Sequence, residues 1–176
     1  CGIVVVGTSH TRPPVGHVLD DRSLRGSPEQ WGRAAVAAYF DHNCEALVAE
    51  INYGGEMVER IIKSTPAHGP YPSGESVRVK VVRAGRGQSK HDRAVPIVGF
   101  FEQNVRGFRR FWLVGNFPVL EGQMTSWVPP ENADSEAIAS SWSPDRLDSC
   151  VWGALYLMVM EARKFGSSQG KVLRKA

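Results

Sequence analysis

The stretch over residues 47–58 constrains the fold of this chain most strongly. It reads LVAEINYGGEMV, a short apolar run that carries Glu50 near its end and is followed by a pair of glycines and a helical pattern. Such a run is typical of a buried parallel strand that leads through a tight turn into a helix. Glu50 would then lie at the carboxyl end of its strand, where ligands bind in open α/β sheets. It is either an acid used for chemistry or a solvated carboxylate at a sheet edge.

The composition is that of an ordinary folded domain. The chain has 176 residues, of which 42% are hydrophobic and 22% are charged. These values differ from those of disordered, collagenous or membrane chains. We expect one domain over residues 1–165 and a flexible basic tail over residues 166–176. Neither a run long enough to span a bilayer nor a signal peptide is evident, so we expect an intracellular protein with no membrane partner.

The start of the chain is unusual. Cys1 is followed almost directly by the apolar residues 3–6, whereas a natural chain begins with methionine and usually has a few loose residues before its first strand. We therefore expect this chain to be a fragment. Its three cysteines, Cys1, Cys44 and Cys150, are widely spaced and form no metal-binding pattern, which predicts reduced thiols.

Strand and helix patterns alternate along the chain and predict an α/β fold. Residues 27–30 form a capping box with Pro28 at the first helical position, so a helix begins there. The predicted strands are residues 3–7 and 16–19, which form a hairpin, the run ending at Glu50, and residues 77–82 and 111–114. The predicted helices start at residues 28, 55, 94, 119 and 145 and end near residues 43, 63, 102, 127 and 164. The predicted loops are residues 64–76, the basic loop 83–90 and the linker 128–141.

Side-chain periodicity predicts which residues of these elements share a face. Met57, Val58, Ile61 and Ile62 are expected to face inward from their helix. Strand periodicity places Val77, Val79 and Val81 on one face of their strand and Arg78 and Lys80 on the other.

Basic residues are concentrated between residues 80 and 93, although the formal net charge is only +3. Basic side chains on a glycine-containing loop can follow a DNA backbone without reading its bases, and a solvated basic face is the alternative. The candidate DNA-binding residues are Lys80, Arg83, Arg86, Lys90 and Arg93.

Two further acids lie at the predicted start of the last helix. Ser143 and Pro144 predict an N-cap and a first helical residue, which places Asp145 and Asp148 in the first turn and on one face. Capping and the helix dipole are sufficient to explain Asp145. Asp148 precedes Trp152 on a face that is expected to be buried, so its carboxylate needs a partner, and a divalent cation is one such partner.

Six segments in the same order resemble the C-terminal nuclease domain of tailed-phage large terminase subunits. They are residues 27–31 (SPEQW), 48–58 (VAEINYGGEMV), 83–87 (RAGRG), 101–103 (FEQ), 114–124 (VGNFPVLEGQM) and 143–148 (SPDRLD). The resemblance covers nearly the whole chain, from Cys1 to about Met160. It implies a ribonuclease H-like fold, in which a mixed sheet is flanked by helices, and an endonuclease that cuts concatemeric double-stranded viral DNA.

The resemblance also implies a set of catalytic and metal-binding residues. Members of this family hold two divalent metal ions, Mg²⁺ or Mn²⁺, with acids on the first strand, at the end of the fourth strand and at the start of the last helix. Glu50 matches the second of these positions, and Asp145 and Asp148 match the third. Carboxylates suit such hard cations. The implied partners are double-stranded DNA, the terminase ATPase domain, the small terminase subunit and the portal, and the implied location is the cytoplasm of a bacterial host cell.

The chain departs from this family at its first strand. The family's first strand and first acid lie upstream of the residues that correspond to Cys1–Val4, so we expect both to be missing here. Two functions therefore remain open: a metal-dependent DNA endonuclease domain, or a nucleic-acid-binding or packaging module of the same fold that has lost cleavage. A phosphate-binding nest at Gly54 and Gly55 is a weaker third interpretation, because no P-loop lysine accompanies the glycines.

Overall fold

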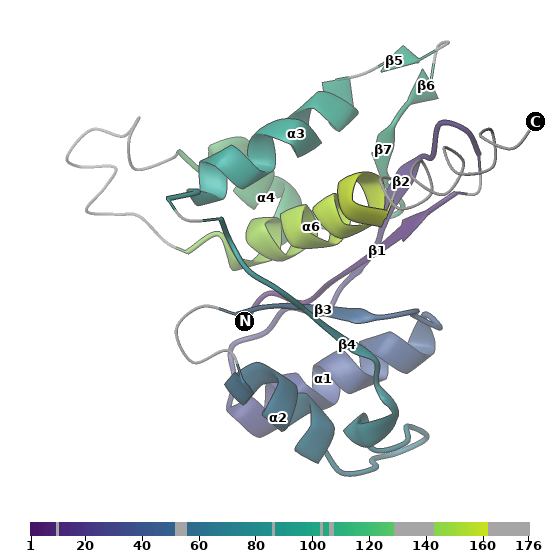
Figure 1. The fold of residues 1–176 in the computed structure, drawn as a ribbon, viewed down its shortest axis with the longest axis vertical. Coiled ribbons are helices and arrows are strands. Elements are labelled where there is room, and N and C mark those ends of the chain that lie inside the picture. Colours follow the sequence, from purple (N-terminus) through teal and green to yellow (C-terminus); the bar gives the residue numbers. More distant parts are fainter. Residues whose placement is uncertain are drawn as a thin grey trace, which may run out of the picture.

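The strands of residues 4–8, 16–21, 47–50 and 79–82 cross the middle of the structure between two groups of helices, and the short strands of residues 104–105 and 108–109 lie at its upper edge (Figure 1). The structure is a computed structural model that describes residues 1–9, 11–51, 56–85, 87–102, 104–105, 108–128 and 143–161. The strands are β1 (Val4–Thr8), β2 (Gly16–Asp21), β3 (Leu47–Glu50), β4 (Val79–Val82), β5 (Asn104–Val105), β6 (Phe108–Arg109) and β7 (Phe111–Leu113). The helices are α1 (Pro28–Asp41), α2 (Glu56–Ser64), the short η1 (Gly74–Ser76), α3 (Lys90–Glu102), α4 (Pro118–Ser126), α6 (Asp145–Leu155) and the π-helical η3 (Tyr156–Glu161).

The strands form three hydrogen-bonded groups. β1 and β2 are the predicted antiparallel hairpin, and β7 joins β2 in parallel to complete a small mixed sheet. β3 and β4 pair in parallel, with Glu50 opposite Val82, which confirms the predicted parallel strand. β5 and β6 form a short antiparallel ribbon. We expected the hairpin and the Glu50 strand in one sheet, but in the described part of the chain they belong to separate sheets.

Two hydrophobic cores lie on opposite sides of the β3–β4 pair, and we call them the upper and the lower core after their places in Figure 1. The upper core packs β2 and β7 against α3, α4 and α6, and its fully buried side chains include Val18, Phe111 and Leu120. The lower core packs α1 and α2 under the strands. Successive strand residues point to opposite faces, so Leu47 contacts the lower core and Val48 contacts the upper one. Burial on both faces explains the continuous apolar run of β3.

Helix α1 begins as its sequence predicts. The hydroxyl of Ser27 accepts a hydrogen bond from the Gln30 backbone, and the Gln30 side chain accepts one from the Ser27 backbone. This reciprocal cap satisfies two of the N–H groups that a helix start leaves unpaired. The helix ends at Asp41, and Asn43 follows in a left-handed conformation (φ 48°), which ends the helical path near the predicted residue.

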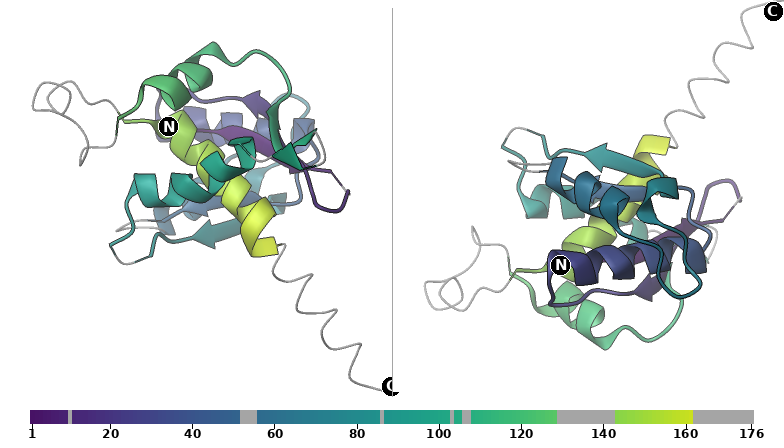
Figure 2. Two further views of the ribbon diagram at one scale, coloured as in Figure 1. Left: turned by 90° about the horizontal axis from the view of Figure 1, so that it is seen from above. Right: turned by 90° about the horizontal axis from the view of Figure 1, so that it is seen from below.

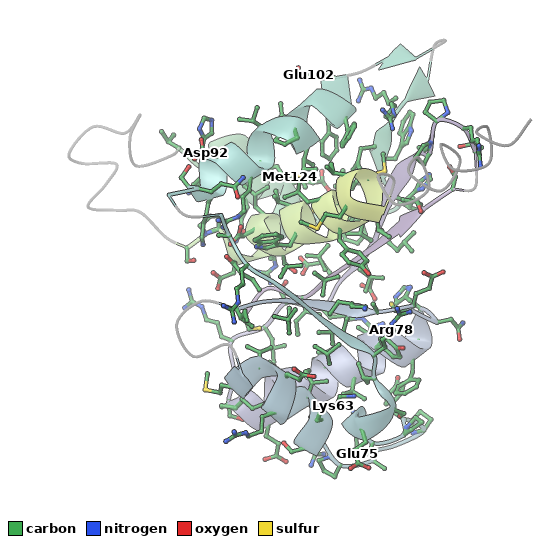
Figure 3. The ribbon with its side chains drawn as sticks, in the orientation of Figure 1. Lys63, Glu75, Arg78, Asp92, Glu102 and Met124 are labelled. Carbon is green, nitrogen blue, oxygen red and sulfur yellow. The ribbon has the colours of Figure 1, made fainter. Side chains whose placement is uncertain are left out.

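Helix α3 differs most from its prediction. It starts at Lys90 rather than near residue 94, because Ser89 and Asp92 cap it reciprocally through their side chains and backbone N–H groups. Figure 3 shows Asp92 at this end of the helix and Glu102 at the other. Pro96 is therefore a residue of the helix interior and does not begin it. Lys90 and Arg93 belong to this helix, not to a flexible basic loop.

One smaller prediction is wrong. Met57 was expected to face inward but is 62% exposed, whereas Ile62 of the same helix is buried. Val82 contacts the upper core and Val79 contacts the lower one, from opposite faces of β4, and Val81 is 42% exposed. The last α-helix ends at Leu155 and continues as a π-helical segment to Glu161, and the predicted helix end near residue 164 lies outside the described residues.

Some predictions concern residues outside the described ranges. These are the linker 128–141 beyond residue 128, the glycine pair at residues 54–55, the domain end at residue 165 and the basic tail 166–176. Among the helices that are described, none combines the length and apolar character needed to cross a bilayer.

Candidate acidic active site

The three acids predicted from the sequence line one cavity. Its volume is about 470 Å³, and its lining residues are Glu50, Ala84, Gln88, Lys90, Arg93, Asp145 and Asp148. These residues come from β3, from the segment that follows β4, and from the first turns of α3 and α6. Segments that are almost 100 residues apart in the sequence therefore bring the carboxylates to one place, as the pattern of strand-end and helix-start acids predicted.

Glu50 and Asp148 both contact the side chain of Arg93. The Nη2 atom of Arg93 donates a hydrogen bond to Oδ1 of Asp148 at 2.9 Å and lies 3.7 Å from Oε1 of Glu50. The two carboxylate oxygens are therefore within about 7 Å of each other, because both are close to the same nitrogen. Asp148 is only 9% exposed, so its charge needs this partner.

Lys90 is the second cation of the site. It lies one helical turn before Arg93, and its Nζ is 3.5 Å from Oδ2 of Asp148. The same ammonium donates a hydrogen bond to the Ser143 hydroxyl at 3.3 Å. Its side chain is 39% exposed, so it lines the cavity and also contacts solvent.

Asp145 is the most exposed of the three acids, with 47% of its side chain accessible. Its carboxylate accepts a short hydrogen bond from the Ser143 hydroxyl and lies 3.6 Å from the backbone nitrogen of Cys1. Figure 2 shows the start of the chain beside the start of α6. A Cβ atom on Gly2 would lie 1.9 Å from the Asp145 carbonyl oxygen, so the chain passes this helix start with no room for a side chain.

Gln123 of α4 holds the start of α6 in place. Its Oε1 accepts hydrogen bonds from the backbone N–H groups of Arg146 and Leu147, both at 3.0 Å. This contact from another helix replaces the predicted Ser143 cap, because Pro144 is the capping residue and provides no side-chain bond. The Arg146 side chain adds an ion pair with Asp21 at 2.8 Å. The turn that carries Asp145 and Asp148 is thus fixed from two sides.

Sequence reasoning missed the roles of Arg93, Gln88 and Gln123. The Ser-x-x-Asp pattern at residues 89–92 is a capping signal that would have started α3 at Lys90 and placed Lys90 and Arg93 one turn apart. No local signal identifies Gln123, because its Oε1 atom accepts hydrogen bonds from backbone N–H groups of a helix that starts 22 residues later in the sequence.

The predicted DNA-binding residues do not form one uniform basic surface. Arg93 is 4% exposed and its guanidinium faces the two acids, so it is not placed to contact a DNA backbone. Lys80 is half-buried, Arg83 is exposed and Lys90 lines the cavity. Arg86 lies outside the described residues.

The chemistry of the acids suits a hard cation, but their arrangement differs from a ready-made metal site. Carboxylate oxygens are the ligands that Mg²⁺ and Mn²⁺ prefer. Yet within the described ranges no three His, Cys, Asp or Glu side chains are grouped closely enough to hold a metal ion. The physical reason is visible in the contacts, since Arg93 lies between Glu50 and Asp148 while Asp145 points toward Ser143 and Cys1.

Comparisons with known proteins add no relative to this description. No protein-family model matches the chain, and neither the curated proteins nor the solved structures include a significant match.

Proposed function

We propose that this chain is the nuclease domain of a tailed-phage large terminase subunit, a ribonuclease H-like, metal-dependent endonuclease that cuts concatemeric double-stranded DNA. The observation that carries the proposal is the meeting of Glu50, Asp145 and Asp148 at one cavity. These are the residues that the family resemblance assigns to catalysis and metal binding. A cavity lined by carboxylates and two cations suits a phosphodiester and a hard cation better than it suits an apolar ligand.

The residues of the cavity divide into two chemical roles. Glu50 and Asp148 would hold Mg²⁺ or Mn²⁺, together with Asp145 from the same helical turn. When bound, such an ion activates a water molecule and neutralises charge on the leaving oxygen. Lys90 offers a partly exposed ammonium for a phosphate oxygen, and the exposed Arg83 extends the cationic surface along the segment before α3.

The resemblance further suggests the setting of this activity. The partners would be double-stranded DNA, the terminase ATPase domain, the small terminase subunit and the portal of an intact phage system. The site of action would be the cytoplasm of the bacterial host cell.

Cleavage of supercoiled plasmid DNA in Mg²⁺ or Mn²⁺ tests this proposal. We expect metal-dependent nicking that falls by about a hundredfold or more in Glu50→Gln and Asp148→Asn, equivalent to about 2.7 kcal/mol of transition-state stabilisation. Glu75→Gln is a matched control, because Glu75 lies on η1 beside Lys63 of α2, away from the cavity (Figure 3). Cleavage that survives Glu50→Gln would place the active site on other residues.

One observation favours a second candidate function, a nucleic-acid-binding or packaging module without cleavage. Arg93 already provides a positive charge close to both Glu50 and Asp148, as expected for acids that have become structural. In that case the cleavage assay would show no nicking in either metal. A gel-shift assay with the same plasmid would show binding that weakens with salt and that Glu50→Gln does not change.

A further inference from the structure

Arg93 is a cation enclosed within the cluster of acids. Its Nη2 contacts Asp148 at 2.9 Å and Glu50 at 3.7 Å, and its Nη1 donates a hydrogen bond to the Gln88 carbonyl at 3.3 Å. The guanidinium lies over the ring of Trp152, 5.2 Å from its centroid. A cation over an aromatic face gains electrostatic energy, and the gain is larger when the cation is desolvated, as it is here at 4% exposure.

The guanidinium lies between two carboxylates, as a metal ion shared by them would. One positive group contacts carboxylates from two elements, β3 and α6, within 4 Å of each. Two acids at this separation, Asp148 buried and Glu50 partly buried, repel unless a positive charge lies between them. In two-metal nucleases a bridging ion supplies that charge. Here the guanidinium of Arg93 supplies it.

The bonds of Arg93 distinguish it from an optimal structural ion pair. A fork-like guanidinium satisfies a carboxylate best when two parallel N–H groups donate to the same group. In this site a single nitrogen serves both acids, and the buried Nε has no hydrogen-bond partner among the described residues. The side chain is therefore placed as a charge between two carboxylates rather than as a matched fork on one of them.

The charge balance of the cavity limits the number of metal ions. Glu50, Asp145 and Asp148 carry three negative charges, and Lys90 and Arg93 carry two positive charges, so the lining has a net charge of −1. One divalent cation and one phosphodiester anion bring this total to zero. Two divalent cations would leave a net charge of +2 even with the phosphodiester bound, and the buried Arg93 could not leave to reduce it.

The geometry points to Arg93 as the substitute for one of the two metal ions, so that this site takes a single divalent cation. This inference rests on the proposed metal-dependent function, and it states how many divalent cations each chain binds. Arg93 is then a positioning residue that holds Glu50 and Asp148, and the cation is bound by carboxylate oxygens that Arg93 does not use.

Counting the Mn²⁺ ions bound by the 176-residue chain tests the inference without any measurement of activity. Isothermal titration and the electron paramagnetic resonance signal of free Mn²⁺ give the stoichiometry and the dissociation constant. We expect one ion for the unmodified chain and for Arg93→Lys, which keeps the charge. We expect Arg93→Met to bind two ions, the first at least tenfold more tightly, because two acids have lost their counter-charge. Arg78→Met should match the unmodified chain, since the exposed Arg78 does not line the cavity.

The possible results separate this inference from the proposed function. If the unmodified chain or Arg93→Lys binds two Mn²⁺ ions, or if Arg93→Met shows unchanged stoichiometry and affinity, the inference is overturned, while plasmid cleavage would still support the nuclease. If no variant binds Mn²⁺, both fall. If Arg93→Met folds only in Mn²⁺, as followed by circular dichroism, the inference is supported, because the metal then replaces the missing guanidinium.

Discussion

Asp20 shows how a single side chain connects two layers of this molecule. Its carboxylate accepts a hydrogen bond from Nε2 of His42 at 2.9 Å and forms an ion pair with Arg22. Asp20 belongs to β2 and His42 follows the last turn of α1. Burial alone would raise the pKa of Asp20, but the bonds from His42 and Arg22 outweigh it and lower the pKa below its usual 3.8.

The lowered pKa gives a prediction about stability and pH. A carboxyl group whose pKa is lower in the folded state stabilises the fold above its unfolded pKa and loses that contribution as pH falls through the folded pKa. We expect Asp20→Asn to cost about 1 kcal/mol at pH 7 and less at pH 3, measured by urea denaturation. Glu29→Gln is a suitable control, since Glu29 is an exposed acid paired only within its own helix in the described structure. A cost that is equal at both pH values would contradict this account.

At the scale of single elements, local signals predicted much of the fold. The hairpin, the capping box of α1 and the parallel strand ending at Glu50 each depend on neighbouring residues and were predicted correctly. The predicted start of α3, near residue 94, is four residues late, because the reciprocal cap between Ser89 and Asp92 starts the helix at Lys90.

The sequence predicted the acids of the candidate site but not their surroundings. Glu50, Asp145 and Asp148 were placed at element ends by local patterns, and those ends meet at one cavity. The contact of Arg93 with two of them depends on the packing of α3 against α6, which no local pattern specifies. Arg93 therefore has the sequence context of a DNA-binding residue, although its side chain is buried against two acids.

The start of α6 provides a prediction at this scale. Gln123→Met keeps the volume of the side chain and removes the acceptor for two backbone N–H groups. We expect a loss of about 1–2 kcal/mol in unfolding free energy and faster amide exchange at Arg146 and Leu147. Thr125→Ala, an exposed change in the same helix, should leave both unchanged. Unaltered exchange at Arg146 and Leu147 in Gln123→Met would show that the cap has no energetic role.

At the scale of the whole molecule, the candidate site lies where the two cores adjoin. Glu50 ends a strand that both cores enclose, and Asp148 belongs to a helix of the upper core. A displacement of α6 from the strands would separate these two acids. The integrity of the site therefore depends on the docking of one helix.

Cys150 lies in that helix, two residues after Asp148, and is 1% exposed. Burial raises the pKa of its thiol to about 12, so thiolate is scarce and shielded while α6 stays docked. In a chain with Cys1→Ser and Cys44→Ser, alkylation of Cys150 would proceed only through opening of the helix. The alkylation rate would then report how often α6 moves away from the strands and separates the acids. We expect this rate to fall at least tenfold in saturating Mn²⁺, because a ligand that binds the closed site reduces the opening of the helix. Equal rates with and without Mn²⁺ would show that the helix opens independently of the acids it carries.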